Sequence, residues 1–338
     1  MKKNYDSLDL LKYVMSFFIV AIHTELFPMV LYPWLRIAVP LFFVVSAFLL
    51  QNKINGDPAN EKQIVRKFCI RLLKLYLFWF VVLLPVTVVV RRPWFADGIA
   101  EGLRLTITNT LFSSTFSASW FIVATIEAML IISFLRSRIS RHVLTAIFLI
   151  VYCICCLRSS YYTLLQGNGL YMLIVKTYEF VFTSPVTSFP VALIWMWIGI
   201  LFANGDIRLS KKHLSVIAVI SAVLLYVEWR WVYAITGTFN NDCYLMLAPL
   251  AVALFGIVKD SDVKVKNGIA MRRISTITFC SHISIIVVLN IVLTRIMIND
   301  SVKSIILFVM TACICHCLSF IIMKLEKNKR LAFLRYSH

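Results

Sequence analysis

The sequence predicts an all-α integral membrane protein, a polytopic bundle of about ten transmembrane helices. Hydrophobic residues make up 60% of its 338 residues and charged residues only 15%, which leaves too little polar surface for a water-soluble protein. The apolar residues stand in long continuous runs, each near the roughly 20 residues that a helix needs to cross a bilayer. Such runs exclude a β-barrel, whose strands alternate apolar and polar residues.

The first run is longer than a signal peptide and lacks a cleavage site, so we expect a retained first span. Two long connections, 98–117 and 159–184, hold apolar stretches that could lie in the membrane interface as helices. We expect one membrane domain over residues 1–338, with no appended soluble domain. The expected spans are, in order, 8–27, 34–51, 68–90, 119–135, 142–157, 185–203, 213–231, 243–258, 274–297 and 303–323.

Lysine and arginine number 34 against 16 acidic residues, a net charge of +18. The positive-inside rule and anionic lipid headgroups account for this excess, so we expect the lipid bilayer as a partner and no nucleic acid. Six of the nine cysteines stand in two apolar runs, at residues 153–156 and 313–317, where cysteine is an ordinary small hydrophobic residue, and no metal site is expected. The chain contains no Walker loop, GxGxxG, HExxH or GxSxG, which leaves nucleotide hydrolysis and serine-hydrolase chemistry without support.

The orientation follows from the basic residues, which concentrate in alternate loops. On this basis both termini are expected on the cytoplasmic side. The richer loops contain Lys2 and Lys3, Lys53 to Arg71, Arg136 to Arg141, Arg208 to Lys212, Lys259 to Arg273 and the tail from Lys324, and the opposite loops contain Arg91, Arg92, Arg104, Arg158, Lys176, Arg230, Arg295 and Lys303.

Ionisable residues inside the apolar runs are the candidates for chemistry, because a charge at membrane depth is costly and usually faces protein or water. Lys12 and His23 are eleven residues apart, close to three helical turns, so they share one stripe about 16 Å long. The alternative is a snorkelling lysine and an interfacial histidine. In the predicted topology Lys12 lies near the cytoplasmic face, and His23 lies level with Arg36 and Glu25 near the outer face.

His23 suits a general base or nucleophile, since imidazole titrates near neutral pH. Arg36 stays charged and suits a developing oxyanion, or alternatively a salt bridge to Glu25. Glu127 is expected to pair with a buried cation, or alternatively to contact a sugar hydroxyl, and His282 could be a core histidine bonded to a carbonyl. The cytoplasmic basic residues suit a ligand that carries phosphate: Lys12, Arg66, Lys67, Arg71 and Lys74.

Six segments, in chain order, form a pattern found in one known family. The spacing from Lys12 to His23 fits Arg/Lys-x10-His, and Arg36 to Leu50 is similar to RxxVPLFFxxSGFLL, with Ala47 at the usual glycine. The segment from Arg71 to Tyr76 resembles RxxR-x-Y, with lysine as the second basic residue. The later segments are Ser119 to Ile122, similar to HLWFL with serine for histidine, Trp197 to Leu201, similar to FxxGxxL, and Ile274 to His282, similar to SxxTFGIYLxH with departures at Cys280 and Ser281.

With these motifs the chain resembles the acyltransferase 3 family of bacterial membrane proteins, which O-acylate envelope and exported glycans. The resemblance implies a multi-pass protein of the bacterial cytoplasmic membrane, with acyl-CoA, commonly acetyl-CoA, as the cytosolic donor substrate, a glycan acceptor and no bound cofactor. It implies His23 and Arg36 as catalytic residues and Lys12, Arg71 and Lys74 beside the donor. Asp9, Glu25, Glu127 and His282 would then contact the acceptor or support the site.

A multi-span transporter of a small solute or glycan intermediate is the alternative, since intramembrane charges also mark transport paths. The spans show no matched pair of helices broken by glycine or proline, which disfavours it. A non-catalytic membrane sensor is a third class. The residues alone do not identify the acceptor glycan, the acyl group, an acyl-histidine intermediate or an oligomeric state.

Overall fold

The computed structural model describes residues 5–294 and 299–338. Lys2, Lys3, Arg295 and the predicted end of the ninth span at residue 297 lie outside the described residues. Every described element is helical, as the sequence predicts. The elements are α1 Asp6–His23, α2 Pro28–Leu35, α3 Ala38–Asn55, η1 Pro58–Asn60, α4 Glu61–Arg91, η2 Arg92–Phe95, α5 Ile99–Phe112, α6 Trp120–Leu135, α7 Arg141–Arg158, α8 Tyr162–Leu165, α9 Gly169–Phe182, η3 Pro185–Thr187, α10 Phe189–Asn204, α11 Lys211–Thr236, α12 Leu247–Lys259, α13 Gly268–Leu293, α14 Asp300–Leu325 and η4 Lys329–Ser337.

Six helical stretches of the described chain are long and apolar enough to cross a membrane: Pro28–Asn55, Pro58–Phe95, Arg141–Arg158, Lys211–Thr236, Gly268–Leu293 and Asp300–Leu325. Shorter apolar helices occupy three further predicted spans, at α6, α10 and α12. The helix of the first predicted span, α1, carries three charged residues, Asp6, Asp9 and Lys12. The predicted number of about ten spans is therefore not confirmed, although a helix lies at each predicted position.

The predicted C-terminal end of the first span is wrong by four residues. The span was expected to continue to Phe27, but α1 ends at His23. Glu25 and Phe27 both have positive φ, 51° and 45°, and Pro28 begins the next helix. Left-handed residues cannot continue a right-handed helix, so the chain turns back directly after His23.

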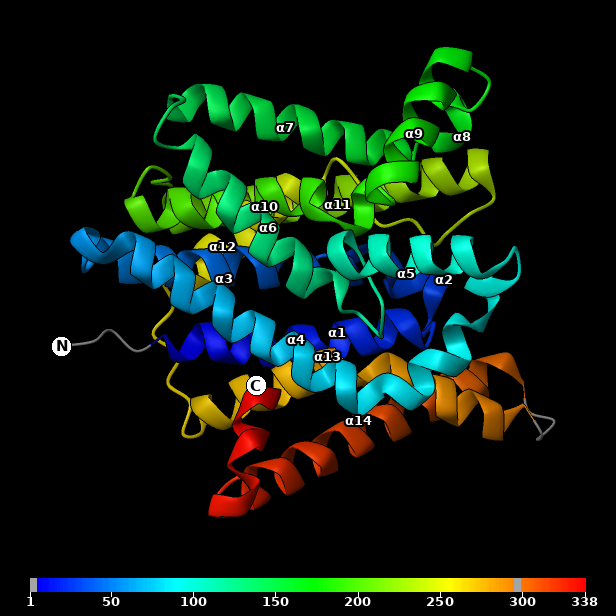
Figure 1. Cartoon of the computed structure of the whole chain (residues 1–338). Coiled ribbons are helices and arrows are strands. Elements are labelled where there is room, and N and C mark those ends of the chain that lie inside the picture. Colours follow the sequence, from blue (N-terminus) through cyan, green and yellow to red (C-terminus); the bar gives the residue numbers. More distant parts are fainter. Residues whose placement is uncertain (1–4, 295–298) are drawn as a thin grey trace.

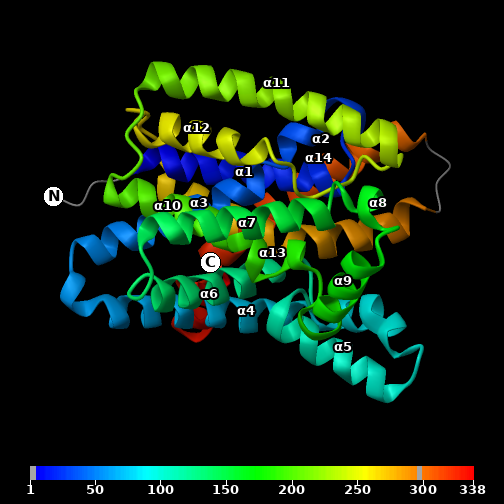
Figure 2. The same cartoon turned by 90° about the horizontal axis from the view of Figure 1, so that it is seen from above.

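The helices lie roughly along one direction in successive layers, from α7 on one side of the bundle to α14 on the other (Figure 1). Seen from above, α3 and α10 lie in the middle of the bundle, between α11 and α4 (Figure 2). Their contact is very close at Gly199, where a Cβ would stand 2.4 Å from the carbonyl oxygen of Val44 and 2.9 Å from Cβ of Ala47. Small residues at this crossing let the two backbones meet.

Helices α1 and α13 run in the same direction, and α3 runs against them. Asp9 of α1 bonds Arg272 near the start of α13, and the His23 ring at the end of α1 contacts His282 further along α13. Arg36, just before α3, shares a cavity with His23, whereas Ser46 within α3 shares one with Lys12. We therefore distinguish a Lys12 end and a His23 end of the bundle.

Loops that the charge pattern assigns to the cytoplasm meet at the Lys12 end. Arg136 bonds Gln51 and Glu61 there, and Arg141 bonds Asp206. At the His23 end the two long connections form helices, as expected, and pack together. Nη1 of Arg104 in α5 donates to the carbonyl oxygen of Phe180 in α9 at 2.9 Å.

Candidate functional site

Two cavities of about 300 and 460 Å³ open among α1, α3, α4 and α13 at the Lys12 end. Both are lined by Lys12, Ser46, Phe68, Arg71 and Arg272, so they adjoin. Together we call them the basic cavity. Lys12 and Arg71 are predicted on this side of the protein from the charge pattern, and both line the same cavity.

The charges of the basic cavity are only partly neutralised. Asp9 accepts two hydrogen bonds from Arg272, at 2.7 and 2.8 Å. Lys12 and Arg71 form no ion pair with a described residue, and lie instead over the rings of Phe42 and Phe68 at 5.6 and 5.8 Å. Two cations that face a cavity without carboxylate partners suit an anionic ligand such as a phosphate.

A third cavity, of about 240 Å³, lies at the His23 end. We call it the histidine cavity. His23 and Arg36 both line it, as the sequence analysis predicted for residues at one depth. Its other polar side chains include Thr187 and Asp242, and its walls carry large aromatic side chains: Phe43, Trp120, Tyr152, Trp195 and Phe279.

His23 faces a second histidine. The ring centroids of His23 and His282 are 5.1 Å apart, with planes inclined at 44°. Nδ1 of His282 lies 3.0 and 2.8 Å from the carbonyl oxygens of Thr278 and Phe279. Carbonyl oxygens only accept, so Nδ1 carries the proton, and Nε2 of the neutral ring is an acceptor.

Nε2 of His282 is buried and has no hydrogen-bond partner among the described residues. His23 is exposed to the cavity and likewise has no hydrogen-bond partner there. A hydrogen bond from one nitrogen of His23 to Nε2 of His282 would therefore satisfy both rings. It would leave the other nitrogen of His23 with its lone pair free for a reacting group.

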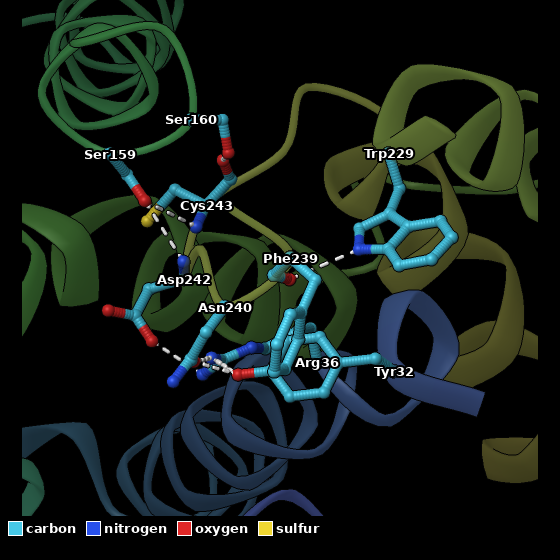
Figure 3. A network of polar contacts seen from close by, with 9 residues as sticks. All are labelled: Tyr32, Arg36, Ser159, Ser160, Trp229, Phe239, Asn240, Asp242 and Cys243. Carbon is cyan, nitrogen blue, oxygen red and sulfur yellow. Dashed lines mark hydrogen bonds and ion pairs between the residues drawn. The ribbon is translucent and has the colours of Figure 1, made fainter. Parts of the chain in front are cut away.

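Arg36 is the centre of a polar network drawn in Figure 3. Its Nη1 pairs with Asp242 Oδ1 at 2.5 Å, and its Nη2 bonds Asn240 Oδ1 at 2.5 Å and the hydroxyl of Tyr32. The alternative salt bridge from Arg36 to Glu25 is wrong, because Asp242 takes that place. Glu25 stands in the left-handed turn after α1 and is exposed.

Arg36 holds the loop at residues 237–246, between α11 and α12, against the histidine cavity, so that this loop forms part of the cavity wall (Figure 3). Ser159 Oγ accepts from the backbone N–H groups of Asp242 and Cys243, at 2.9 and 3.2 Å. Nε1 of Trp229 donates to the carbonyl oxygen of Phe239 at 3.1 Å. We call residues 237–246 the α11–α12 loop.

Four predicted site residues stand apart from these cavities or have another partner. Lys74 lies over the Tyr336 ring at 4.9 Å and lines neither cavity. Asp9 lines the basic cavity and is bound to Arg272, at the opposite end from an acceptor beside His23. Glu25 does not line the histidine cavity. The expected cation partner of Glu127 is not found among the described residues, and its Oε2 is buried without a hydrogen bond.

Three residues that the sequence analysis did not single out belong to the site. Arg272 was counted as one loop charge among many, and its pairing with Asp9 joins elements at opposite ends of the sequence. Asp242 follows two asparagines in a polar stretch, with no local pattern that points to Arg36. Phe279 belongs to the motif-like segment from Ile274 to His282, which gave it no role of its own, and it lines both the basic and the histidine cavity.

Comparison with known proteins gives one family. The sequence profile of a family described as an acyltransferase domain matches residues 5–324. An amino-acid racemase of Enterococcus faecalis is 22% identical over 280 residues, which are 79% of this chain and 39% of that protein. The chain thus spans about two fifths of that relative's length. No solved structure matches.

Proposed function

The chain belongs to the family of the acyltransferase domain, and from this membership we propose that it is a membrane O-acyltransferase of the bacterial cytoplasmic membrane. In this proposal it moves an acyl group, acetyl in the simplest case, from cytosolic acyl-CoA to a sugar hydroxyl of a cell-envelope or exported glycan. The observation that carries the proposal is the pair of cavities. The basic cavity and the histidine cavity, which holds the free imidazole of His23, lie at opposite ends of the stripe from Lys12 to His23.

The basic cavity supports a nucleotide donor. Lys12 and Arg71 have no carboxylate partner among the described residues, so both cations are available to bind the phosphates of CoA. Lys12 and His23 are separated by about 16 Å along α1, a distance that an extended pantetheine arm can bridge. The thioester would then arrive beside His23, with the nucleotide at the Lys12 end.

The histidine cavity supports the transfer itself. The acceptor hydroxyl oxygen forms a bond to the thioester carbonyl carbon, and the carbon–sulfur bond breaks. His23 takes the hydroxyl proton and returns it to the leaving thiolate, so that the ester and free CoA thiol are the products. His282 would hold the opposite nitrogen of His23, which keeps the reacting lone pair turned toward the cavity. If the acyl group is first carried on His23, the net reaction is the same: the carbon–sulfur bond is replaced by an ester bond, and the proton of the hydroxyl passes to the thiolate.

The walls of the histidine cavity support a sugar acceptor. Trp120, Tyr152 and Trp195 provide broad apolar faces, and the Asp242 carboxylate, 44% exposed, provides a hydrogen-bond acceptor at its edge. Pockets of this make-up, apolar walls with a few placed polar groups, bind and orient small polar rings. Arg36 touches Asp242, so it acts on the acceptor side of the cavity.

The test compares alkali-labile acyl esters on envelope glycans from cells that lack the gene and from cells that express wild type, His23→Ala or His316→Ala at equal levels. His316 is the matched control, because it also lies in a membrane helix and bonds Tyr13 at 2.8 Å, away from both cavities. We expect esters with wild type and His316→Ala only. Full ester content with His23→Ala would overturn the catalytic assignment. Equal ester content in all four strains, together with solute flux in proteoliposomes free of acyl-CoA, would favour the transporter.

A further inference from the structure

The basic cavity and the histidine cavity are separated by aromatic side chains. Phe42 and Phe121 line the basic cavity, Phe43 lines the histidine cavity, and Phe279 lines both. All four are buried, with exposed fractions of 9% or less. We call these four residues the aromatic partition.

The rings of the aromatic partition touch one another. The centroid of Phe279 lies 4.9 Å from that of Phe121 and 5.7 Å from that of Phe42, and Phe43 lies 4.3 Å from Phe121. These distances are those of aromatic pairs in contact. The rings come from α3, α6 and α13, so the contact closes the space between three helices.

Phe279 is the member of the partition placed to act on the donor. Its ring borders both cavities, and its carbonyl oxygen accepts from Nδ1 of His282 at 2.8 Å. The next residue, Cys280, also lines the basic cavity and is small. A change of the Phe279 side-chain rotamer alone would open the passage between the two cavities with the helices in place.

We propose that Phe279 is a specificity-determining residue that closes the passage between the two cavities and limits the acyl chain that can cross it. The inference rests on the proposed function, in which the thioester reaches His23 from the basic cavity. A short acyl group on a thin pantetheine arm passes the Phe279 ring. A longer acyl chain does not fit beyond the ring, because the histidine cavity of about 240 Å³ must also hold the acceptor. The same ring keeps the basic cavity closed to solutes from the His23 end.

The first experiment measures closure and needs no acyl-CoA. In a chain freed of its native cysteines, Ser46→Cys places a thiol in the basic cavity and Thr187→Cys places one in the histidine cavity. A membrane-impermeant methanethiosulfonate is added from the His23 side of reconstituted vesicles. We expect Thr187→Cys to react with or without Phe279→Ala, and Ser46→Cys to react only when Phe279→Ala is also present. Equal labelling of Ser46→Cys in both backgrounds would overturn the closure.

The second experiment measures selectivity with acetyl-, butyryl- and hexanoyl-CoA. Phe279→Ala should reduce the preference for acetyl over hexanoyl at least about tenfold, as expected when a side chain that bounds a chain-length pocket is removed. Phe148→Ala removes a buried ring of α7 that contacts Trp197 and lines neither cavity, and it should leave the preference unchanged. An unchanged preference in Phe279→Ala would overturn the selectivity. If no CoA thioester is used at all, the proposed function fails, and the labelling result still decides whether Phe279 closes the passage.

Discussion

At the scale of single residues, the structure explains why a glycine stands in the segment from Trp197 to Leu201. A Cβ on Gly199 would meet the carbonyl oxygen of Val44 at 2.4 Å and the backbone nitrogen of Phe48 at 2.9 Å. Both are backbone atoms of α3, which cannot rotate away. The facing residue is Ala47, so the crossing is built from two small residues, and α3 and α10 must separate if either grows.

Gly199→Ala is therefore expected to destabilise the protein by about 1–3 kcal/mol, the range of an overpacked core. The sign of this change in unfolding free energy is informative, because replacing glycine by alanine in a helix stabilises it by up to about 1 kcal/mol when space is available. Thermal unfolding in detergent, followed by tryptophan fluorescence, measures the change.

Gly167→Ala is the matched control, since a Cβ there meets nothing within 4 Å. It should unfold at the wild-type temperature or above. A Gly199→Ala protein that unfolds together with the control would contradict the close approach of α3 and α10.

The residue scale also separates what sequence could predict of the site from what it could not. Lys12 and His23 were found from helical spacing alone, because both stand on one helix. The partner of Arg36 was missed, because Asp242 is more than 200 positions away and Glu25 is near in sequence. Local spacing gives no information on such a contact. Phe279 was missed for another reason: it stands in the motif-like segment from Ile274 to His282, but a motif does not show which cavities a side chain borders, because other helices form their walls.

At the scale of elements, helices follow from the apolar runs, but their ends depend on individual backbone angles. The turn from Thr24 to Phe27 breaks a run that hydropathy alone would continue, because Glu25 and Phe27 adopt positive φ. This early end has a consequence for the site. It places His23 in the last turn of α1, where the side chain reaches the histidine cavity.

The α11–α12 loop is the element whose position depends most on one side chain. Arg36 pairs with Asp242 and bonds Asn240, and its guanidinium side chain is only 11% exposed. Removal of the Asp242 carboxylate leaves the charge of the nearly buried Arg36 guanidinium uncompensated, which costs more than the pair itself contributes, whereas Asp242 is 44% exposed and keeps contact with water when Arg36 is lost. Arg36→Met and Asp242→Asn should each lower the unfolding temperature and the rate of acyl transfer. The double variant should lose less than the two single losses added together.

The measurement is a double-mutant cycle on both properties, with an expected coupling of about 0.5–3 kcal/mol. The pair of Arg158 and Glu179 at the same end is the control, because its side chains line neither cavity and its arginine is 27% exposed, against 11% for Arg36. Its cycle should give a coupling near that of surface pairs, below about 1 kcal/mol. Strictly additive losses at Arg36 and Asp242 would show that the loop is held by its other bonds, such as those from Ser159.

At the scale of the whole molecule, the parallel course of α1 and α13 assigns each cavity to one end of the bundle. The carboxylate of Asp9 meets Arg272 at one end, and His23 meets His282 at the other. Each cavity could therefore exchange with a different compartment. The charge pattern predicted which residues share an end of the bundle, because loops rich in lysine and arginine alternate with loops that contain few of them. It could not predict the cavities, which arise from side chains of several helices.

The proposed direction of transfer requires the Lys12 end to face the cytoplasm, where acyl-CoA is made. Fluorescent protein fused after His338 should then fluoresce. Alkaline phosphatase inserted at Gly167, in the connection between α8 and α9 at the His23 end, should be active, because its disulfides form only outside the cytoplasm. Exchange of the two reporters should give inactive fusions. The opposite pattern would place the basic cavity outside, beyond the reach of cytosolic acyl-CoA. The donor would then have to enter beside His23, where Arg36 lines the histidine cavity but is already paired with Asp242, whereas Lys12 and Arg71 of the basic cavity have no carboxylate partner among the described residues. The geometry therefore favours the orientation with the Lys12 end in the cytoplasm.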